Sequence, residues 1–80
     1  MNSLKMETPA FYRICVQGRV DAEWSDRLAG MRIIRSDATA GGATTVLEGR
    51  LLDQAALFGL LATLYDLHLP VLKVECLREN

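Results

Sequence analysis

The chain has few cysteines, one histidine and no long apolar run, and each shortage excludes a class of protein. Cys15, Cys76 and His68 show none of the paired spacings of a zinc site, so we expect no metal and no cofactor. No run approaches the ~18–20 apolar residues of a membrane span. Residues 1–10 lack the apolar stretch of a secretory signal, which predicts a cytoplasmic protein with free, buried thiols. The alternative, a Cys15–Cys76 bridge, requires their strands to pair.

A surplus of charge of one sign is also missing. Nine basic and ten acidic residues give a net charge of −1, whereas a nucleic-acid partner usually requires a basic excess. Half of the residues are apolar, which argues against disorder. Eighty residues form one small domain with a thin stability margin. We expect a flexible tail over residues 1–10 and a single domain over 11–80, with no nucleic-acid partner and no membrane contact.

Alternation and turn residues divide the chain into short elements. The expected strands occupy residues 11–20, 31–37, 43–51 and 71–77. In the first strand, Tyr12, Ile14, Val16 and Val20 share one face, which should be the buried one. Asp21 and Gly30 delimit a helix of at most two turns, and Gly41-Gly42 marks a tight hairpin between the second and third strands. In the last strand, Leu72, Val74 and Cys76 should face inward and the charged residues outward. Together with charged residues of the other strands, they should give the solvent-facing side of the sheet a mixed charge.

The segment 53–69 predicts a long helix with two apolar sides instead of one. Asp53 is its expected N-cap, and Pro70 follows its end, where His68 can adopt a left-handed conformation. The first side carries four leucines and should face the sheet. The second side consists of Ala55, Phe58, Ala62, Tyr65 and Leu69. Either the short helix or a second molecule must cover this second side.

The order of elements predicts an α+β fold, namely a four-stranded antiparallel sheet with one long and one short helix on one face. The ferredoxin-like βαββαβ arrangement is its natural topology. The connection over residues 21–30 is near the lower limit for a crossover. If it is only a wide turn, the first three strands form a meander and the order becomes βββαβ.

Several short motifs resemble those of a group of small uncharacterised bacterial proteins. The matching segments are residues 18–20, 24–26, 30–33, 45–49, 53–57 and 66–72. The pattern of that group looks like W-S-[DE], then D-Q-A-A-L, then D-L-x-L-P. This chain has Arg27 where a second tryptophan is common, Phe58 where histidine is usual, and His68 where glycine is usual. The resemblance implies a bacterial, cytoplasmic protein and carries no activity that can be transferred.

Two functional hypotheses follow from these patterns. The first is a non-enzymatic domain that acts as a homodimer or other homo-oligomer, or binds an unidentified partner protein. Its candidate interface consists of Ala55, Phe58, Ala62, Tyr65, Leu69 and Trp24. The alternative is a small-molecule-sensing regulatory domain with its ligand near residues 18–24, by analogy of fold. No catalytic group is expected, since Asp66 and His68, two residues apart on a helix, cannot orient one another.

Overall fold

The computed structural model describes residues 9–39 and 41–77. Its elements, in chain order, are β1 (Ala10–Gln17), the 3₁₀-helix η1 (Ala22–Leu28), β2 (Arg32–Thr39), β3 (Gly42–Leu51), α1 (Gln54–Asp66) and β4 (Val71–Leu77). Of the expected tail, residues 1–8 lie outside the described residues, and Ala10 already belongs to β1.

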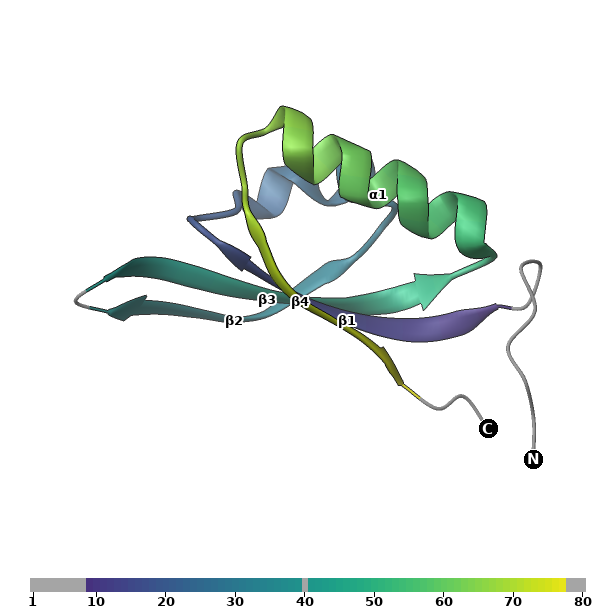
Figure 1. The fold of residues 1–80 in the computed structure, drawn as a ribbon, viewed down its shortest axis with the longest axis horizontal. Helices are drawn as coiled ribbons and strands as arrows, with labels where there is room; N and C mark the ends of the chain where they lie inside the picture. Colours follow the sequence, from purple (N-terminus) through teal and green to yellow (C-terminus); the bar gives the residue numbers. More distant parts are fainter. Residues whose placement is uncertain (1–8, 40, 78–80) are drawn as a thin grey trace.

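The four strands form one antiparallel sheet in the order β2-β3-β1-β4. Because β3 lies between β1 and β2, the connection that contains η1 crosses over, and the meander alternative is wrong. Figure 1 shows α1 and η1 on the same side of the sheet. The expected short helix is a 3₁₀-helix, so the described residues contain one α-helix. A 3₁₀-helix rises about 2.0 Å per residue against 1.5 Å in an α-helix, which suits a short segment that must pass over a neighbouring strand.

The core lies between the sheet and the helices. Tyr12, Ile14 and Val16 of β1 are buried, as the alternation predicted, and Ile14 lies opposite Leu47 of β3. The helix α1 adds Leu57, Leu60 and Leu64 to this core, and η1 adds Leu28. The leucine side of α1 therefore faces the sheet, as predicted.

The other face of the sheet is open and carries mixed charge. Arg13 forms an ion pair of 2.8 Å with Glu48 of β3 and lies 4.0 Å from Glu75 of β4. Cys15 is on this face, whereas Cys76, opposite Tyr12 in the register, is on the helix side. Their strands pair, but the two thiols are on opposite faces and are free. The prediction of free thiols is confirmed, although Cys76 is exposed and Cys15 only half-buried.

Both ends of α1 are capped by local hydrogen bonds. The backbone N–H of Ala56 donates to the Asp53 carboxylate at 2.7 Å, as predicted for an N-cap. At the other end the Leu69 N–H donates to the Leu64 carbonyl, and His68 has a φ of 59°. This pattern is a Schellman motif, in which the left-handed residue reverses the chain. The left-handed conformation of His68 is confirmed, but α1 ends at Asp66, earlier than the predicted 69.

The turn after α1 is tied to the end of β1. The Gln17 N–H donates to the Pro70 carbonyl at 2.8 Å. The buried Thr45 hydroxyl donates to the Gly18 carbonyl at 2.7 Å. These bonds hold the start of β4 against β1, so the C-terminal end of α1 and the first residues of β4 stay close together.

Candidate interaction surface

The structure divides the six predicted interface residues into two groups. Ala55, Phe58, Ala62 and Tyr65 are exposed on α1, with 62% of Phe58 and 80% of Tyr65 accessible to solvent. Leu69 is buried and Trp24 is half-buried against the core, although Leu69 still lines the groove described below. Leu69 is buried because the Schellman motif turns the residue after His68 back onto the helix.

The short helix does not cover the exposed side of α1. It packs beside α1, where Ala56 and Leu67 are partly buried against the core. At 100° per residue, Phe58 and Tyr65 project from the opposite flank. That flank points toward β4, since Leu61 and Tyr65 line a groove together with Val71 and Val74.

The strand β4 forms one edge of the sheet. Val74 lies opposite Ile14 in the register and so is on the helix side. The prediction that Leu72, Val74 and Cys76 are turned into the core is wrong, because all three are exposed. Val71 is exposed as well. The helix α1 connects β3 to β4 and so crosses over β1, which lies between them in the sheet. It leaves much of the outermost strand uncovered.

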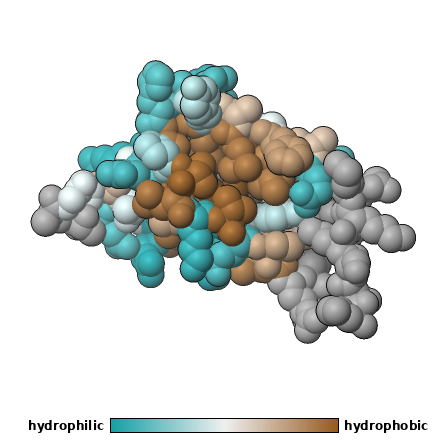
Figure 2. Space-filling model, in the orientation of Figure 1, coloured by the Kyte–Doolittle hydropathy of each residue, from teal (hydrophilic) through white to brown (hydrophobic). Residues whose placement is uncertain are grey.

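An apolar groove of about 580 Å³ lies between the C-terminal half of α1 and the start of β4. Figure 2, seen from the β4 side, shows a continuous apolar surface over these two elements. We call the region of α1 and β4 around this groove the α1–β4 surface. It consists of the groove residues Leu61, Tyr65, Val71 and Val74 and of the exposed apolar residues Phe58 and Leu72 on the same two elements.

The α1–β4 surface is large for a domain of this size. With about 150–250 Å² for each whole aromatic side chain, the exposed parts of Phe58 and Tyr65 alone offer roughly 300 Å². The aliphatic residues of β4 add to this area. The largest apolar patch on a typical monomer is about 300–600 Å² and is often functional.

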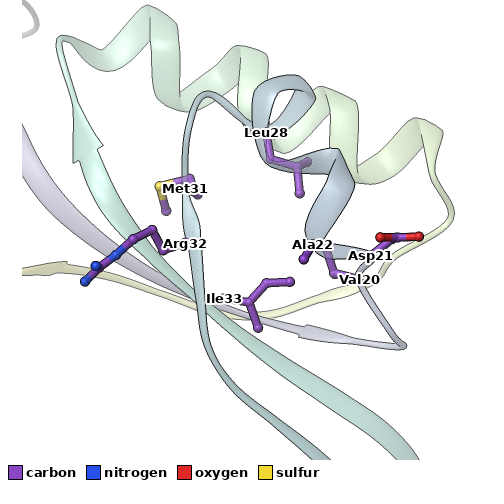
Figure 3. A pocket seen from close by; sticks show the side chains of 7 residues that line it. All are labelled: Val20, Asp21, Ala22, Leu28, Met31, Arg32 and Ile33. Carbon is purple, nitrogen blue, oxygen red and sulfur yellow. The ribbon is translucent and has the colours of Figure 1, made fainter.

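A second, smaller cavity lies beneath η1 and corresponds to the region predicted for a small-molecule ligand. It has a volume of about 220 Å³ and is lined by apolar side chains of Val20, Leu28 and Ile33 (Figure 3). Figure 3 shows the charged ends of Asp21 and Arg32 pointing away from it. The Asp21 carboxylate instead accepts a hydrogen bond from the backbone of Glu23. Ligand pockets are usually about 300–1,000 Å³ and place a few polar groups toward the ligand.

The described residues contain little that could carry chemistry. Over 9–39 and 41–77 there is no group of three or more His, Cys, Asp or Glu residues that could hold a metal ion. Burial, followed by the influence of Cys76, raises the pKa of Tyr12, and its hydroxyl accepts a hydrogen bond from Gln54 at 2.6 Å. This phenol belongs to the core and lies outside the α1–β4 surface. No helix within the same two ranges is long and apolar enough to cross a membrane.

Sequence reasoning missed the contribution of β4 to the surface. Leu72, Val74 and Cys76 alternate with Lys73 and Glu75 in the way of a half-buried strand. A strand at the edge of the sheet shows the same alternation, so the pattern does not reveal how far the helix reaches. In the βαββαβ order the last strand lies at an edge of the sheet. That position is the feature from which the exposure of its apolar residues could have been predicted.

The fold and its surface define a class, namely a small two-layer α+β domain with an uncovered apolar region shared by a helix and an edge strand. Residues 11–75 match the family model described as "Domain of unknown function (DUF8691)", and the chain belongs to this family. No curated protein and no solved structure matches the chain. The resemblance to an uncharacterised family is consistent with this match.

Proposed function

We propose that this domain acts by self-association or by binding a partner protein through the α1–β4 surface, and that it performs no catalysis. The observation that supports the proposal is the continuity of exposed apolar side chains from Phe58 and Tyr65 on α1 to Val71 and Val74 on β4. Exposed apolar regions of this size usually mark interaction sites. A domain of eighty residues also gains stability that its own core cannot supply when it associates.

We further propose a cytoplasmic homodimer of ferredoxin-like topology. The strand order supports this topology, because β1 and β2 are separated by β3, and β3 and β4 are separated by β1. Two such split connections are characteristic of the ferredoxin-like arrangement. The 3₁₀-helix takes the place of its first helix.

Sedimentation velocity at micromolar concentration tests self-association. We expect a dimer for the wild type and a monomer for Phe58→Asp, since a carboxylate at this position would be buried without a partner in the complex. Phe58 is mostly exposed, so the variant should keep its circular dichroism spectrum. Leu52→Asp is the matched control, because Leu52 is 67% exposed and precedes α1 outside the α1–β4 surface. A folded wild type that stays monomeric would contradict self-association.

The cavity beneath η1 supports a second candidate function, the sensing of a small molecule. Its volume of about 220 Å³ and apolar lining suit a compact apolar ligand or an apolar side group of a larger one. A thermal-shift panel of amino acids, nucleotides and small apolar compounds tests it. A rise in melting temperature that Leu28→Ala removes would support sensing, and a flat response across the panel would count against it.

A further inference from the structure

We infer that the occupant of the α1–β4 surface is a second copy of this chain, joined through the outer edge of β4 in an antiparallel pair with its two-fold axis at Val74. This inference rests on the proposed function, which makes the surface an interface of a homodimer or with a partner protein but does not specify which strands and residues pair. The result would be one continuous eight-stranded sheet with both α1 helices on the same side.

The two edges of the sheet are protected in similar ways, and β4 differs from β2 in lying beside the exposed apolar side of α1. Natural edge strands avoid pairing with other molecules through bulges and charged side chains. Each edge strand carries an ion pair between residues two apart, Arg35–Asp37 at 2.9 Å on β2 and Lys73–Glu75 at 3.7 Å on β4. The edge strand β2 also has a register shift between Ile33 and Arg35. On β4 the register shift is near the start, between the partners of Cys15 and Val16, and the register is regular from Lys73 to Leu77. Through this segment β4 pairs with β1 alone among the described strands.

The charges on β4 select one register. Lys73 and Glu75 share the open face of the sheet, on either side of Val74. With the two-fold axis at Val74, Lys73 lies opposite the partner subunit's Glu75, and the reverse pair forms by symmetry. An axis one residue earlier or later places Lys73 or Glu75 opposite its own copy. Opposite charges across an antiparallel pair are favourable and like charges are not, so the Val74 register is preferred.

The helix side of this dimer accommodates the aromatic residues. The axis of α1 lies over β1, so the two helices would be three strand spacings apart, or about 14 Å at roughly 4.8 Å per strand. Directly packed helices are about 8–10 Å apart. In the dimer, Tyr65, which lines the groove with Val74, would project into the remaining space, and Phe58, two turns earlier on the same side of α1, would extend the contact. The aromatic side chains and the strand edge together bring the buried area toward the ~800 Å² per partner of a standard interface.

Charge reversal at the two β4 positions tests the pairing. Lys73→Glu places like charges opposite each other twice across the axis, as does Glu75→Lys. We expect each single variant to dissociate about tenfold more readily than the wild type in sedimentation equilibrium. An equimolar mixture of the two variants should recover the wild-type dissociation constant, because each supplies the charge that the other lacks. The double variant K73E/E75K should also recover it.

The variants separate the pairing from the stability of the subunit. Glu75 also lies near Arg13 in its own chain, so Glu75→Lys alone can weaken the fold. Lys73→Glu leaves that contact in place but removes the 3.7 Å ion pair of Lys73 with Glu75 of its own chain, so both single variants need a stability control. If the mixture of the two single variants recovers the wild-type dissociation constant, the weaker association of each variant alone cannot be due to a damaged fold. Thermal unfolding of each variant at low concentration checks that the monomer is folded.

The outcomes also separate this inference from the proposed function. If Phe58→Asp abolishes the dimer while charge reversal and mixing have no effect, the surface is an interface but the β4 pairing is wrong. If the wild type is a dimer that Phe58→Asp leaves intact but charge reversal disrupts, the edge pairs without the aromatic surface, and the arrangement inferred for α1 is wrong. A wild type that is monomeric throughout the micromolar range overturns the self-association proposal and this inference together.

Discussion

Replacing His68 by glycine should stabilise this domain, although it removes a side chain. His68 has a φ of 59° at the end of α1, where the Leu69 and His68 N–H groups donate to the Leu64 and Tyr65 carbonyls. A non-glycine residue in the left-handed conformation costs about 1–2 kcal/mol, and glycine costs about 0.5–1 kcal/mol more than alanine in lost chain entropy. His68 is exposed, so little packing is lost. The difference predicts a gain of about 0.5–1 kcal/mol.

Thermal and urea denaturation measure this gain. For a domain of this size it corresponds to a rise in melting temperature of about 3–6 °C. His68→Ala is the matched control, because alanine also lacks the imidazole but retains the left-handed penalty, and its melting temperature should not rise. His68 borders the α1–β4 groove, so each comparison is made at two protein concentrations to separate unfolding from dissociation.

The reasoning is refuted if His68→Gly melts at or below the wild-type temperature. It is also refuted if His68→Ala gives the same rise, because the effect would then come from loss of the imidazole and not from the backbone conformation.

Two other perturbations test the core. Gly49→Ala should cost about 1–3 kcal/mol in urea denaturation, since its Cβ would lie 2.6 Å from Met31 Sδ and 3.2 Å from Met31 Cα. A Cβ at Gly59 of α1 would meet nothing within 4 Å, so Gly59→Ala should raise the free energy of unfolding by about 1 kcal/mol. Equal changes in stability at the two glycines would contradict the packing argument. Burial raises the pKa of Tyr12, so the unfolded chain ionises first as the pH passes about 10, and stability falls there. Tyr12→Phe should lessen the fall in the free energy of unfolding between about pH 9 and 11. If the slope of that free energy against pH is the same in the variant, Tyr12 is not the cause of the fall.

The sequence predicted the elements whose signals are local. The alternation in β1 identified Tyr12, Ile14 and Val16 as the buried set, because the side chains of a strand point alternately to its two faces. Asp53 marked the start of α1, since its carboxylate satisfies an N–H of the first turn. The end of α1 was placed three residues too late, because the apolar periodicity continues through Leu67 and Leu69 beyond the last helical residue, Asp66.

Which residues form the candidate surface depends on how elements far apart in the sequence pack together. The sequence therefore predicted only part of this surface. Phe58 and Tyr65 were placed correctly on an exposed side of α1, but whether Trp24 reaches that side depends on where the crossover lies. The connection runs past β3, so η1 packs on the flank of α1 away from β4. Val71 and Val74 joined the surface because the helix axis is over β1, and no local pattern encodes that position.

The central position of β1 has a consequence for how the chain folds as it is synthesised. β1 is the first strand of the sheet and pairs with β4, its last, with Phe11 opposite Leu77. The hairpin of β2 and β3 can form early, because its partners are close in sequence. The pairing of β1 with β4 joins residues at opposite ends of the domain sequence. Contacts between residues so far apart in the sequence slow folding. A nascent chain in which β1 has paired with β3 therefore keeps one open edge on β1 until β4 leaves the ribosome, and exposed strand edges of this kind favour aggregation.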